Sequence, residues 1–266
     1  MKIAIIGAGN LGQSIAKGLI TTNAITSLYL TKRQLESIAS FEGYQNVKVT
    51  SDNVLAVRKS DILIFAVQPA HFENILKEIA PLITEKHVII STITGYSIAK
   101  IEAVVGEAQF VIRAMPNTAI AVGKSMTCMC SNTKGEQRIK IAEAIFNRLG
   151  TSISIPEGQM QAATVVCASG VAFWMRLIRA TTQAAIQLGF DAKEAQELAM
   201  HTCEGAASLL ITTGNHPEQE IDKVTTPKGC TIEGLNEMEH KGLSSSLIQG
   251  MVTSFNKINS IKTEQL

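Results

Sequence analysis

The 266-residue sequence lacks the patterns of a protein that depends on disulfides, metal ions or nucleic acid. Its five cysteines are an odd number and none are spaced as Cys-x-x-Cys, which is typical of reduced thiols in a cytoplasmic protein. The five histidines form no His-x-x-x-His pair, so we expect no zinc-protease type of metal site. A net charge of +1 lacks the basic excess of general nucleic-acid binders. We therefore predict a cytoplasmic protein that uses no metal and binds no nucleic acid.

The sequence also has no long run made only of strongly apolar residues. Its longest uncharged stretch, from Gly158 to Met175, is interrupted by glutamine, threonine, serine and glycine. We interpret this stretch, in which Trp174 is expected to pack in the core, as a buried helix rather than a membrane span. The chain opens directly with the strand-like Lys2–Ile6, and we expect no signal peptide and no membrane association.

The first part of the chain alternates strand-length and helical patterns. Because the Val- and Ile-rich runs are apolar on both faces, they are typical of a parallel sheet covered by helices on both sides. The predicted strands are Ile3–Ile6, Leu28–Leu30, Ile62–Val67, Val88–Ile90, Phe110–Ile112, Ser125–Cys130 and Thr151–Ile155. The predicted helices between them are Leu11–Ile20, Phe72–Ile83 and Lys134–Leu149.

The strand pattern stops after Pro156. Residues 158–213 carry apolar side chains at helical spacing, with a cap at Asp191, and helical patterns return at 231–240 and 244–259. We predict an α/β protein with an N-terminal Rossmann-like, doubly wound, mostly parallel sheet in residues 1–155 and an all-helical domain in residues 156–266. The first part holds 16 basic and 11 acidic residues, a balance that suits an anionic cofactor or reflects ordinary surface variation.

A glycine-rich turn follows the first predicted strand. The segment Gly7-Ala8-Gly9-Asn10-Leu11-Gly12 matches G-x-G-x-x-G at the start of a helix. The first glycine permits a tight turn, the second lets a pyrophosphate approach the backbone, and the third lets the helix pack closely on the strand. The N–H groups of the helix N-terminus then face the phosphates. This context favours dinucleotide binding over an ordinary glycine turn.

The end of the second predicted strand lacks the carboxylate that usually binds the ribose of NAD. The sequence there reads Thr31-Lys32-Arg33, and the next acidic residue is Glu36. A hydroxyl and two cations suit a 2′-phosphate, so we predict NADPH as the preferred cofactor, with NADH possible. The alternative is that Lys32 and Arg33 only open a solvated helix.

Two further segments have the composition of binding loops. Arg113–Thr118 follows the strand Phe110–Ile112, where ligands bind in open α/β sheets, although Pro-Asn is also common in plain turns. Val224–Ile232 leads into a helix and combines hydroxyls with a glycine, which suits a carboxylate pocket or a threonine helix cap. Cys128 and Cys130 are expected to be packing residues rather than ligands.

Several of these motifs together resemble the pyrroline-5-carboxylate reductase family over nearly the whole chain. Asp222–Ile232 is similar to the family's D-x-V-T-S-P-G-G-T-T-I signature, and Arg113–Thr118 is similar to its R-x-M-P-N-T segment. Ala168–Phe173 resembles G-S-G-P-A-Y, while Ala66–Pro69 and Ser91–Gly95 resemble its cofactor loops. Asn53 falls where the family has an asparagine near the adenosine ribose.

The resemblance implies a reductase that transfers hydride from NAD(P)H to the C=N carbon of 1-pyrroline-5-carboxylate and forms L-proline. It implies a helical domain that interlocks with a second copy, in homodimers often assembled into decamers. The hydroxyl of Thr231 would bond the ring nitrogen as the catalytic group, and Thr226, Lys228, Gly229 and Cys230 would surround the carboxylate. The expected cofactor-binding residues are Ile6, Gly7, Ala8, Gly9, Asn10, Leu11, Gly12, Thr31, Lys32, Arg33, Asn53, Ala66, Val67, Gln68, Pro69, Ile93, Thr94, Gly95, Met115, Pro116 and Asn117.

The sequence departs from the family pattern at four positions, which leaves other readings open. Lys228 replaces the first glycine of the Gly-Gly pair, Val171 replaces a proline, Ala119 stands where a proline is usual, and Cys230 replaces a threonine. One alternative is a reductase of another cyclic imine or ketimine carboxylate. Another is a non-catalytic NADPH sensor whose helical part is an interaction module.

A β-hydroxyacid dehydrogenase is disfavoured. That chemistry needs a lysine on the long helix after the boundary, and the sequence has no lysine between Lys140 and Lys193.

Overall fold

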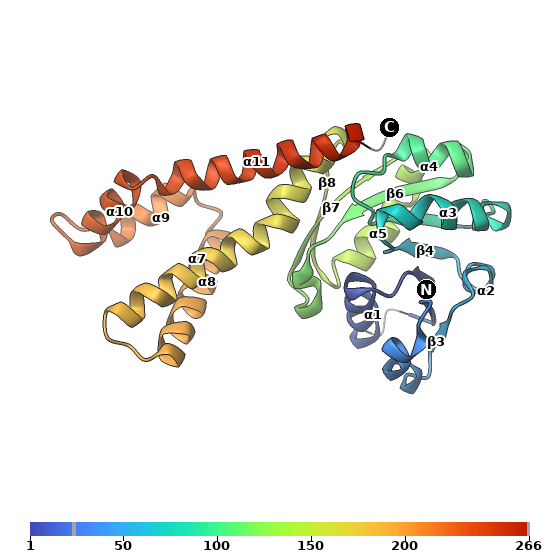
Figure 1. Ribbon diagram of the computed structural model, residues 1–266, viewed down its shortest axis with the longest axis horizontal. Coiled ribbons are helices and arrows are strands. Elements are labelled where there is room, and N and C mark those ends of the chain that lie inside the picture. Colours follow the sequence, from blue (N-terminus) through green and yellow to red (C-terminus); the bar gives the residue numbers. More distant parts are fainter. Residues whose placement is uncertain (23–24, 265–266) are drawn as a thin grey trace. The chain divides into compact units, whose positions relative to one another are not determined.

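The computed structural model describes residues 1–22 and 25–264, with side chains through residue 260. The chain divides into two compact units, which are Met1–Ser169 with Phe255–Leu266, and Gly170–Ser254 (Figure 1). The first unit contains the strands and the second contains only helices. Strands therefore end before Pro156, while the first unit itself continues to Ser169. The boundary near residue 156 stays a prediction.

The first unit is built on an eight-stranded sheet with the order β3-β2-β1-β4-β5-β6-β7-β8. The six strands from β3 to β6 are parallel, β7 is antiparallel to β6, and β8 is parallel to β7. The order 3-2-1-4-5-6 is that of a Rossmann fold, which confirms the predicted fold class. The strands are β1 (Lys2–Ile6), β2 (Ser27–Thr31), β3 (Val47–Thr50), β4 (Ile62–Phe65), β5 (Val88–Ser91), β6 (Phe110–Met115), β7 (Ser125–Ser131) and β8 (Gly150–Ser154).

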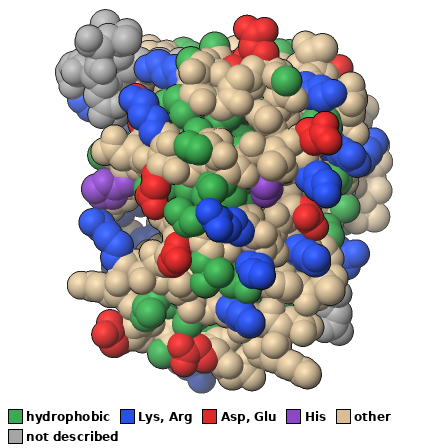
Figure 2. All heavy atoms as spheres, turned by 90° about the vertical axis from the view of Figure 1, so that its right-hand side faces the viewer, with side chains coloured by type: hydrophobic (Ala, Val, Ile, Leu, Met, Phe, Trp, Pro, Cys, Tyr) green, Lys and Arg blue, Asp and Glu red, His purple; other side chains and the backbone are tan. Residues whose placement is uncertain are grey.

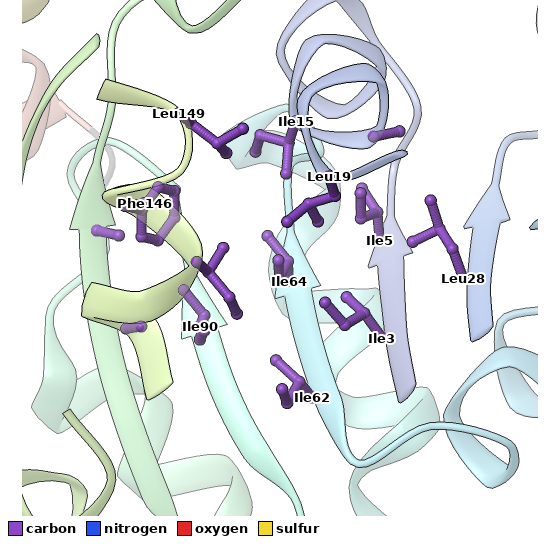
Figure 3. Packing of buried hydrophobic residues seen from close by; sticks show 14 of the residues in the cluster. Ile3, Ile5, Ile15, Leu19, Leu28, Ile62, Ile64, Ile90, Phe146 and Leu149 are labelled. Atoms are coloured by element: carbon purple, nitrogen blue, oxygen red, sulfur yellow. The ribbon is translucent and has the colours of Figure 1, made fainter. Parts of the chain in front are cut away.

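Helices cover both faces of this sheet, because neighbouring residues of each strand point to opposite sides. Ile3 and Ile5 pack with α1 and α5 in one buried cluster, while Ala4 and Ile6 pack with α2, α3 and α4 in the other. Figure 3 shows the first cluster, in which Ile15 and Leu19 of α1 lie over the strands. The helices are α1 (Asn10–Thr21), α2 (Asn53–Arg58), α3 (Pro69–Ile79), α4 (Ile98–Val105) and α5 (Ile139–Phe146).

The helical unit consists of long helices joined by short loops. Asp191 caps α8 by accepting hydrogen bonds from the N–H groups of Lys193 and Glu194, at 2.8 and 3.0 Å, as the sequence predicts. Helix α7 packs on α8. The helices are α7 (Gly170–Gln187), α8 (Ala192–Thr213), α9 (Pro217–Val224), α10 (Cys230–His240) and α11 (Leu243–Glu264), of which α11 belongs to the first unit from Phe255 on.

Much apolar surface of the helical part is exposed in the single chain. The helical stretch Glu157–Gln187 is long and apolar enough to cross a membrane by length and composition alone, and 17% of its most apolar window is buried. The predictions that this stretch is buried and that Trp174 packs in the core are therefore wrong for one chain, since Trp174 is 56% exposed. Ile211 of α8 is 83% exposed. Exposed apolar surface of this extent marks an interaction surface, with another protein chain or with a membrane.

Candidate functional site

The glycine turn joins the end of β1 to the start of α1 at the switch point of the sheet, where β1 lies between β2 and β4. Gly7 has a φ of +99°, and a Cβ placed there would lie 2.4 Å from Val67 Cγ1. A Cβ on Gly12 would lie 2.2 Å from the carbonyl oxygen of Gly7. At Gly9, the cap of α1, no described residue other than its chain neighbours has an atom within 4 Å of the Cβ position. The turn thus has the tight bend, the close packing and the open backbone that a dinucleotide pyrophosphate requires.

Thr31 stabilises the glycine turn from the end of β2. Its Oγ1 accepts a hydrogen bond from the N–H of Gly7 at 3.2 Å, and its carbonyl oxygen accepts one from Ala8 at 2.8 Å. Thr31 is buried and its hydroxyl supports the turn, while its contact with a 2′-phosphate stays a prediction. Lys32 is half-buried and Arg33 is exposed just beyond the strand.

Three further predicted segments follow strands of the same sheet. Asn53 is the half-buried first residue of α2. The segment Ala66–Pro69 follows β4, where the N–H of Ala66 donates to Ile6 at 2.9 Å and Pro69 begins α3. Ile93–Gly95 follows β5, and Gly95 has a φ of +78°. Because parallel strands end at one edge, these segments and the glycine turn lie along the same edge of the sheet.

Thr92 lies inside the predicted loop Ser91–Gly95 but was not among the predicted binding residues, and it ties two of these segments together. Its N–H and its hydroxyl both donate to the carbonyl oxygen of Phe65, at 3.0 and 2.7 Å. The signal available in the sequence was the position of Thr92, directly after the buried strand and before the turn at Thr94-Gly95.

The first half of the predicted loop Arg113–Thr118 belongs to a strand in the structure. Arg113, Ala114 and Met115 belong to β6, because this strand pairs with β5 on one side and β7 on the other. The buried guanidinium of Arg113 forms an ion pair with Glu157 at 2.8 Å, and Glu157 also accepts the N–H of Ile98 at 2.7 Å. Glu157 was not among the predicted residues.

The loop proper therefore begins at Pro116. Met115, Pro116 and Asn117 are all buried at the carboxyl edge of the sheet. The Thr94 hydroxyl lies 4.0 Å from the Met115 sulfur, which links the ends of β5 and β6.

In the helical unit, the segment Val224–Ile232 forms a turn that ends at the N-terminus of α10. Gly229 caps this helix, and a Cβ there would lie 2.4 Å from Thr226 Oγ1. Because glycine has no side chain, it leaves the first N–H groups of α10 without a side-chain cap, which excludes a threonine cap. Thr231 is the second residue of α10 and is exposed, as are Thr226 and Cys230.

Lys228 of this turn has an unusual backbone conformation. Its φ is +60°, and among the residues that the structure describes it is the only non-glycine residue with a positive φ. The left-handed region is costly for a residue with a Cβ. The family pattern has glycine here, so the chain keeps the shape of the turn and adds a cation.

The buried thiols are packing residues, as predicted. Burial raises the pKa of the Cys130 thiol to about 11, and burial together with the neighbouring Cys167 thiol, 3.8 Å away, raises the pKa of Cys128. Both thiols are therefore protonated near neutral pH and poorly reactive. Across residues 1–22 and 25–264, no group of three or more Cys, His, Asp or Glu side chains is arranged to hold a metal ion.

Two family models match the chain. The model described as pyrroline-5-carboxylate reductase dimerisation matches residues 157–261. The model described as NADP oxidoreductase coenzyme F420-dependent matches residues 2–95, which include the glycine turn.

Curated relatives match almost the whole chain. Pyrroline-5-carboxylate reductase 1 of Dictyostelium discoideum is 43% identical over 99% of this chain, which spans 50% of that protein's length. Pyrroline-5-carboxylate reductase 2 of the same organism is 41% identical, covering 96% of this chain and 91% of the relative. The enzyme of Methanosarcina acetivorans is 32% identical, covering 94% of each.

Solved structures agree with these matches. A pyrroline-5-carboxylate reductase from Coxiella burnetii superposes with a TM-score of 0.91 at 28% identity, covering 97% of each chain. A Plasmodium falciparum pyrroline carboxylate reductase with NADP bound shares the fold, with a TM-score of 0.87 at 24% identity over 98% of each chain. On the identity of its full-length relatives, the chain belongs to the pyrroline-5-carboxylate reductase family of oxidoreductases.

Proposed function

We propose that this chain reduces 1-pyrroline-5-carboxylate to L-proline, with NADPH as the preferred hydride donor and NADH as a weaker one. The observation that carries the proposal is the 41% identity to a curated reductase over nearly the full length of both chains. The open Gly9, the close-packed Gly12 and the Thr-Pro-Lys-Gly turn on α10 supply sites for a cofactor and a carboxylate.

The cofactor lies across the carboxyl edge of the sheet in this proposal. Its pyrophosphate sits at the N-terminus of α1, over Gly7–Gly12, and its adenosine end approaches Lys32, Arg33 and Asn53. Its nicotinamide end lies along Ala66–Pro69, Ile93–Gly95 and Met115–Asn117. Two cations beyond β2 support a 2′-phosphate and hence NADPH.

The substrate binds at the N-terminus of α10. The N–H groups of Cys230 and Thr231 and the Thr226 hydroxyl hold the carboxylate, with Lys228 adding a positive charge. The N–H of Gly229 donates to the carbonyl oxygen of Thr226 at 2.9 Å and so shapes the turn. The Thr231 hydroxyl bonds the ring nitrogen and orients the C=N carbon. When bound, the nicotinamide supplies the hydride, and the chain's own residues supply orientation and polarisation of the imine.

A second copy of the chain completes the enzyme. The family model for dimerisation covers residues 157–261, and these helices carry exposed apolar side chains such as Trp174 and Ile211. We propose a homodimer in which the α10 turn of one subunit serves the cofactor of the other, with a decamer as a further assembly. We also propose residues 1–155 and 156–266 as domains of a cytoplasmic protein that binds neither nucleic acid nor membrane.

The face turned to the viewer in Figure 2 has basic and acidic side chains interspersed with apolar ones. On this face the basic side chains form no stripe of one sign such as nucleic-acid binders carry.

The experiment mixes the protein with NADPH or NADH and with 1-pyrroline-5-carboxylate or another cyclic imine. Oxidation of the cofactor is measured as the decrease in nicotinamide absorbance. Oxidation of NADPH with 1-pyrroline-5-carboxylate, faster than with NADH, supports the proposal. Faster oxidation of NADPH with another cyclic imine than with 1-pyrroline-5-carboxylate identifies a different substrate. That result would fit the departures from the family pattern at Lys228 and Val171. Binding of NADPH without oxidation by any imine supports the sensor instead.

Catalysis by Thr231 has its own test. Thr231→Ala should lower kcat/KM about a hundredfold while the unfolding midpoint stays near wild type, because this exposed hydroxyl acts only on the substrate. Full activity of this variant would remove Thr231 from the mechanism.

A further inference from the structure

A π-helical turn interrupts the long helical stretch after Glu157. Thr164–Ser169 is π-helical, between α6 (Met160–Ala163) and α7. Such turns replace i→i+4 hydrogen bonds by i→i+5 bonds and are common at functional sites. Here the carbonyl oxygen of Cys167 accepts a hydrogen bond from Asn117 Nδ2 at 3.0 Å. The turn is thus tied to the loop after β6.

The side-chain amide of Asn117 forms hydrogen bonds with backbone groups of the protein itself. Its Oδ1 accepts the N–H of Ala119 at 3.0 Å, and its own N–H donates to Ser125 Oγ at 3.0 Å. Ser125 Oγ in turn lies 3.2 Å from Thr127 Oγ1. Asn117 is 7% exposed, and Ser125 and Thr127 are fully buried. A buried network of this kind holds its members in one geometry.

This network lies at the edge where the nicotinamide end of the cofactor is proposed to bind. Asn117 follows β6, and Thr94 after β5 reaches Met115 at the end of β6. The glycine turn after β1 lies at the same edge, two strands from β5. The Asn117–Cys167 bond therefore brings the π-helical turn to that edge.

We propose that Asn117 is a positioning residue, rather than a cofactor ligand, which fixes the turn Cys167–Ser169 as one wall of the nicotinamide pocket. The proposal rests on the proposed dinucleotide site. Without the bond, the Cys167 carbonyl loses this donor, the turn loses its tie to the loop after β6, and the wall relaxes. A pocket with a relaxed wall holds the nicotinamide less well, so both cofactor affinity and turnover decrease.

Asn132 provides a matched control at the other edge of the sheet. It is 8% exposed, its Oδ1 accepts from Val111 and Gly135, and its Nδ2 donates to Glu102 and Gln109. It follows β7, which runs antiparallel to β6, so it lies at the edge opposite to the cofactor. Its truncation removes comparable buried hydrogen bonds away from the nicotinamide.

The experiment compares Asn117→Asp, Asn117→Ala and Asn132→Ala in the full chain. Asn117→Asp retains an oxygen for the Ala119 N–H but, when ionised, no longer donates to Cys167, and it serves if the alanine variant fails to fold. Asn117→Ala removes the same donor without adding a charge. Urea unfolding midpoints, the NADPH Kd from nicotinamide fluorescence, and kcat and KM are measured.

Both Asn117 variants should raise the NADPH Kd about tenfold and lower kcat, because a buried donor is lost at the pocket wall. Asn132→Ala should lower the unfolding midpoint while its Kd stays within about twofold of wild type. Wild-type Kd and kcat in Asn117→Asp, or an equal rise in Kd in Asn132→Ala, would overturn the proposal. A wild-type chain that binds NADPH but reduces no imine would refute the proposed function, and the Kd comparison would still decide the role of Asn117.

Discussion

Gly12 and Gly9 occupy the same turn but have opposite surroundings. A Cβ on Gly12 would lie 2.2 Å from the backbone oxygen of Gly7, which has no flexible end to move away. Gly12→Ala should therefore lower the free energy of unfolding by about 2–3 kcal/mol, measured by urea denaturation, and weaken NADPH binding.

Gly9→Ala is the matched partner of that variant. Because a Cβ at Gly9 meets no described residue within 4 Å apart from its chain neighbours and its φ is −72°, the fold should be unaffected. The same methyl group would occupy the proposed path of the pyrophosphate, so the NADPH Kd should rise at least about tenfold. Unchanged NADPH affinity in Gly9→Ala would show that the phosphates bind elsewhere.

Lys228 combines a strained backbone conformation with a positive charge. Two substitutions at this position distinguish the effect of the strain from the effect of the charge. Lys228→Gly should raise the free energy of unfolding by about 1 kcal/mol, because glycine adopts a φ of +60° without a Cβ penalty. It should also raise the KM for the imine carboxylate more than it changes kcat.

Lys228→Asn is the control, since asparagine tolerates this conformation but carries no charge. Lys228→Asn should raise the KM for the imine carboxylate as Lys228→Gly does. Its free energy of unfolding should stay closer to that of the wild type than that of Lys228→Gly. A KM equal to wild type in both variants would mean that this lysine faces solvent.

At the scale of elements, one ion pair joins three of them. Glu157, at the start of the helical stretch, contacts Arg113 of β6 and the first residue of α4. Glu157→Ala should lower the free energy of unfolding by about 3 kcal/mol, measured in urea, because it leaves a buried guanidinium unpaired. The exposed pair Glu73–Lys77 is the comparison, and Glu73→Ala should leave the free energy of unfolding nearly unchanged. Equal losses in the two variants would contradict a structural role for the Glu157 pair.

Sequence patterns predicted most elements of the first unit because strands buried on both faces have a simple signature. They missed β3, whose four residues Val47–Thr50 lie at the edge of the sheet and are partly exposed. They also ended β6 before Arg113, because an arginine in a buried strand requires a partner that lies 44 residues away in the sequence. The glycine turn was predictable since its function depends on local backbone geometry.

The role of Asn117 was not predictable from sequence. Its carbonyl partner at Cys167 is 50 residues away in the sequence and lies in a π-helical turn that no local motif predicts. Thr31 is a similar case, since only the sheet register brings its hydroxyl to Gly7.

At the scale of the whole molecule, we expect a second copy of the chain to cover the exposed apolar side chains of the helices, which match the dimerisation model. Burial of Trp174 was expected within one chain, whereas it is more than half exposed. Trp174→Asp should shift the protein from dimers toward monomers in sedimentation experiments, because large aromatic side chains dominate such interfaces.

Tyr44→Asp in the first unit removes an aromatic of similar exposure, 49%, and should leave the assembly unchanged. Dimers of normal stability in Trp174→Asp would place the interface elsewhere.

The most direct test of the reaction follows the hydride itself. The wild-type protein is mixed with NADPH deuterated at C4 of the nicotinamide, in the transferable position, and with 1-pyrroline-5-carboxylate, and the product is analysed by mass spectrometry. The account predicts proline that carries one deuterium, at the carbon of the former C=N bond. Proline without the label, or the absence of proline while NADPH binds, would contradict it.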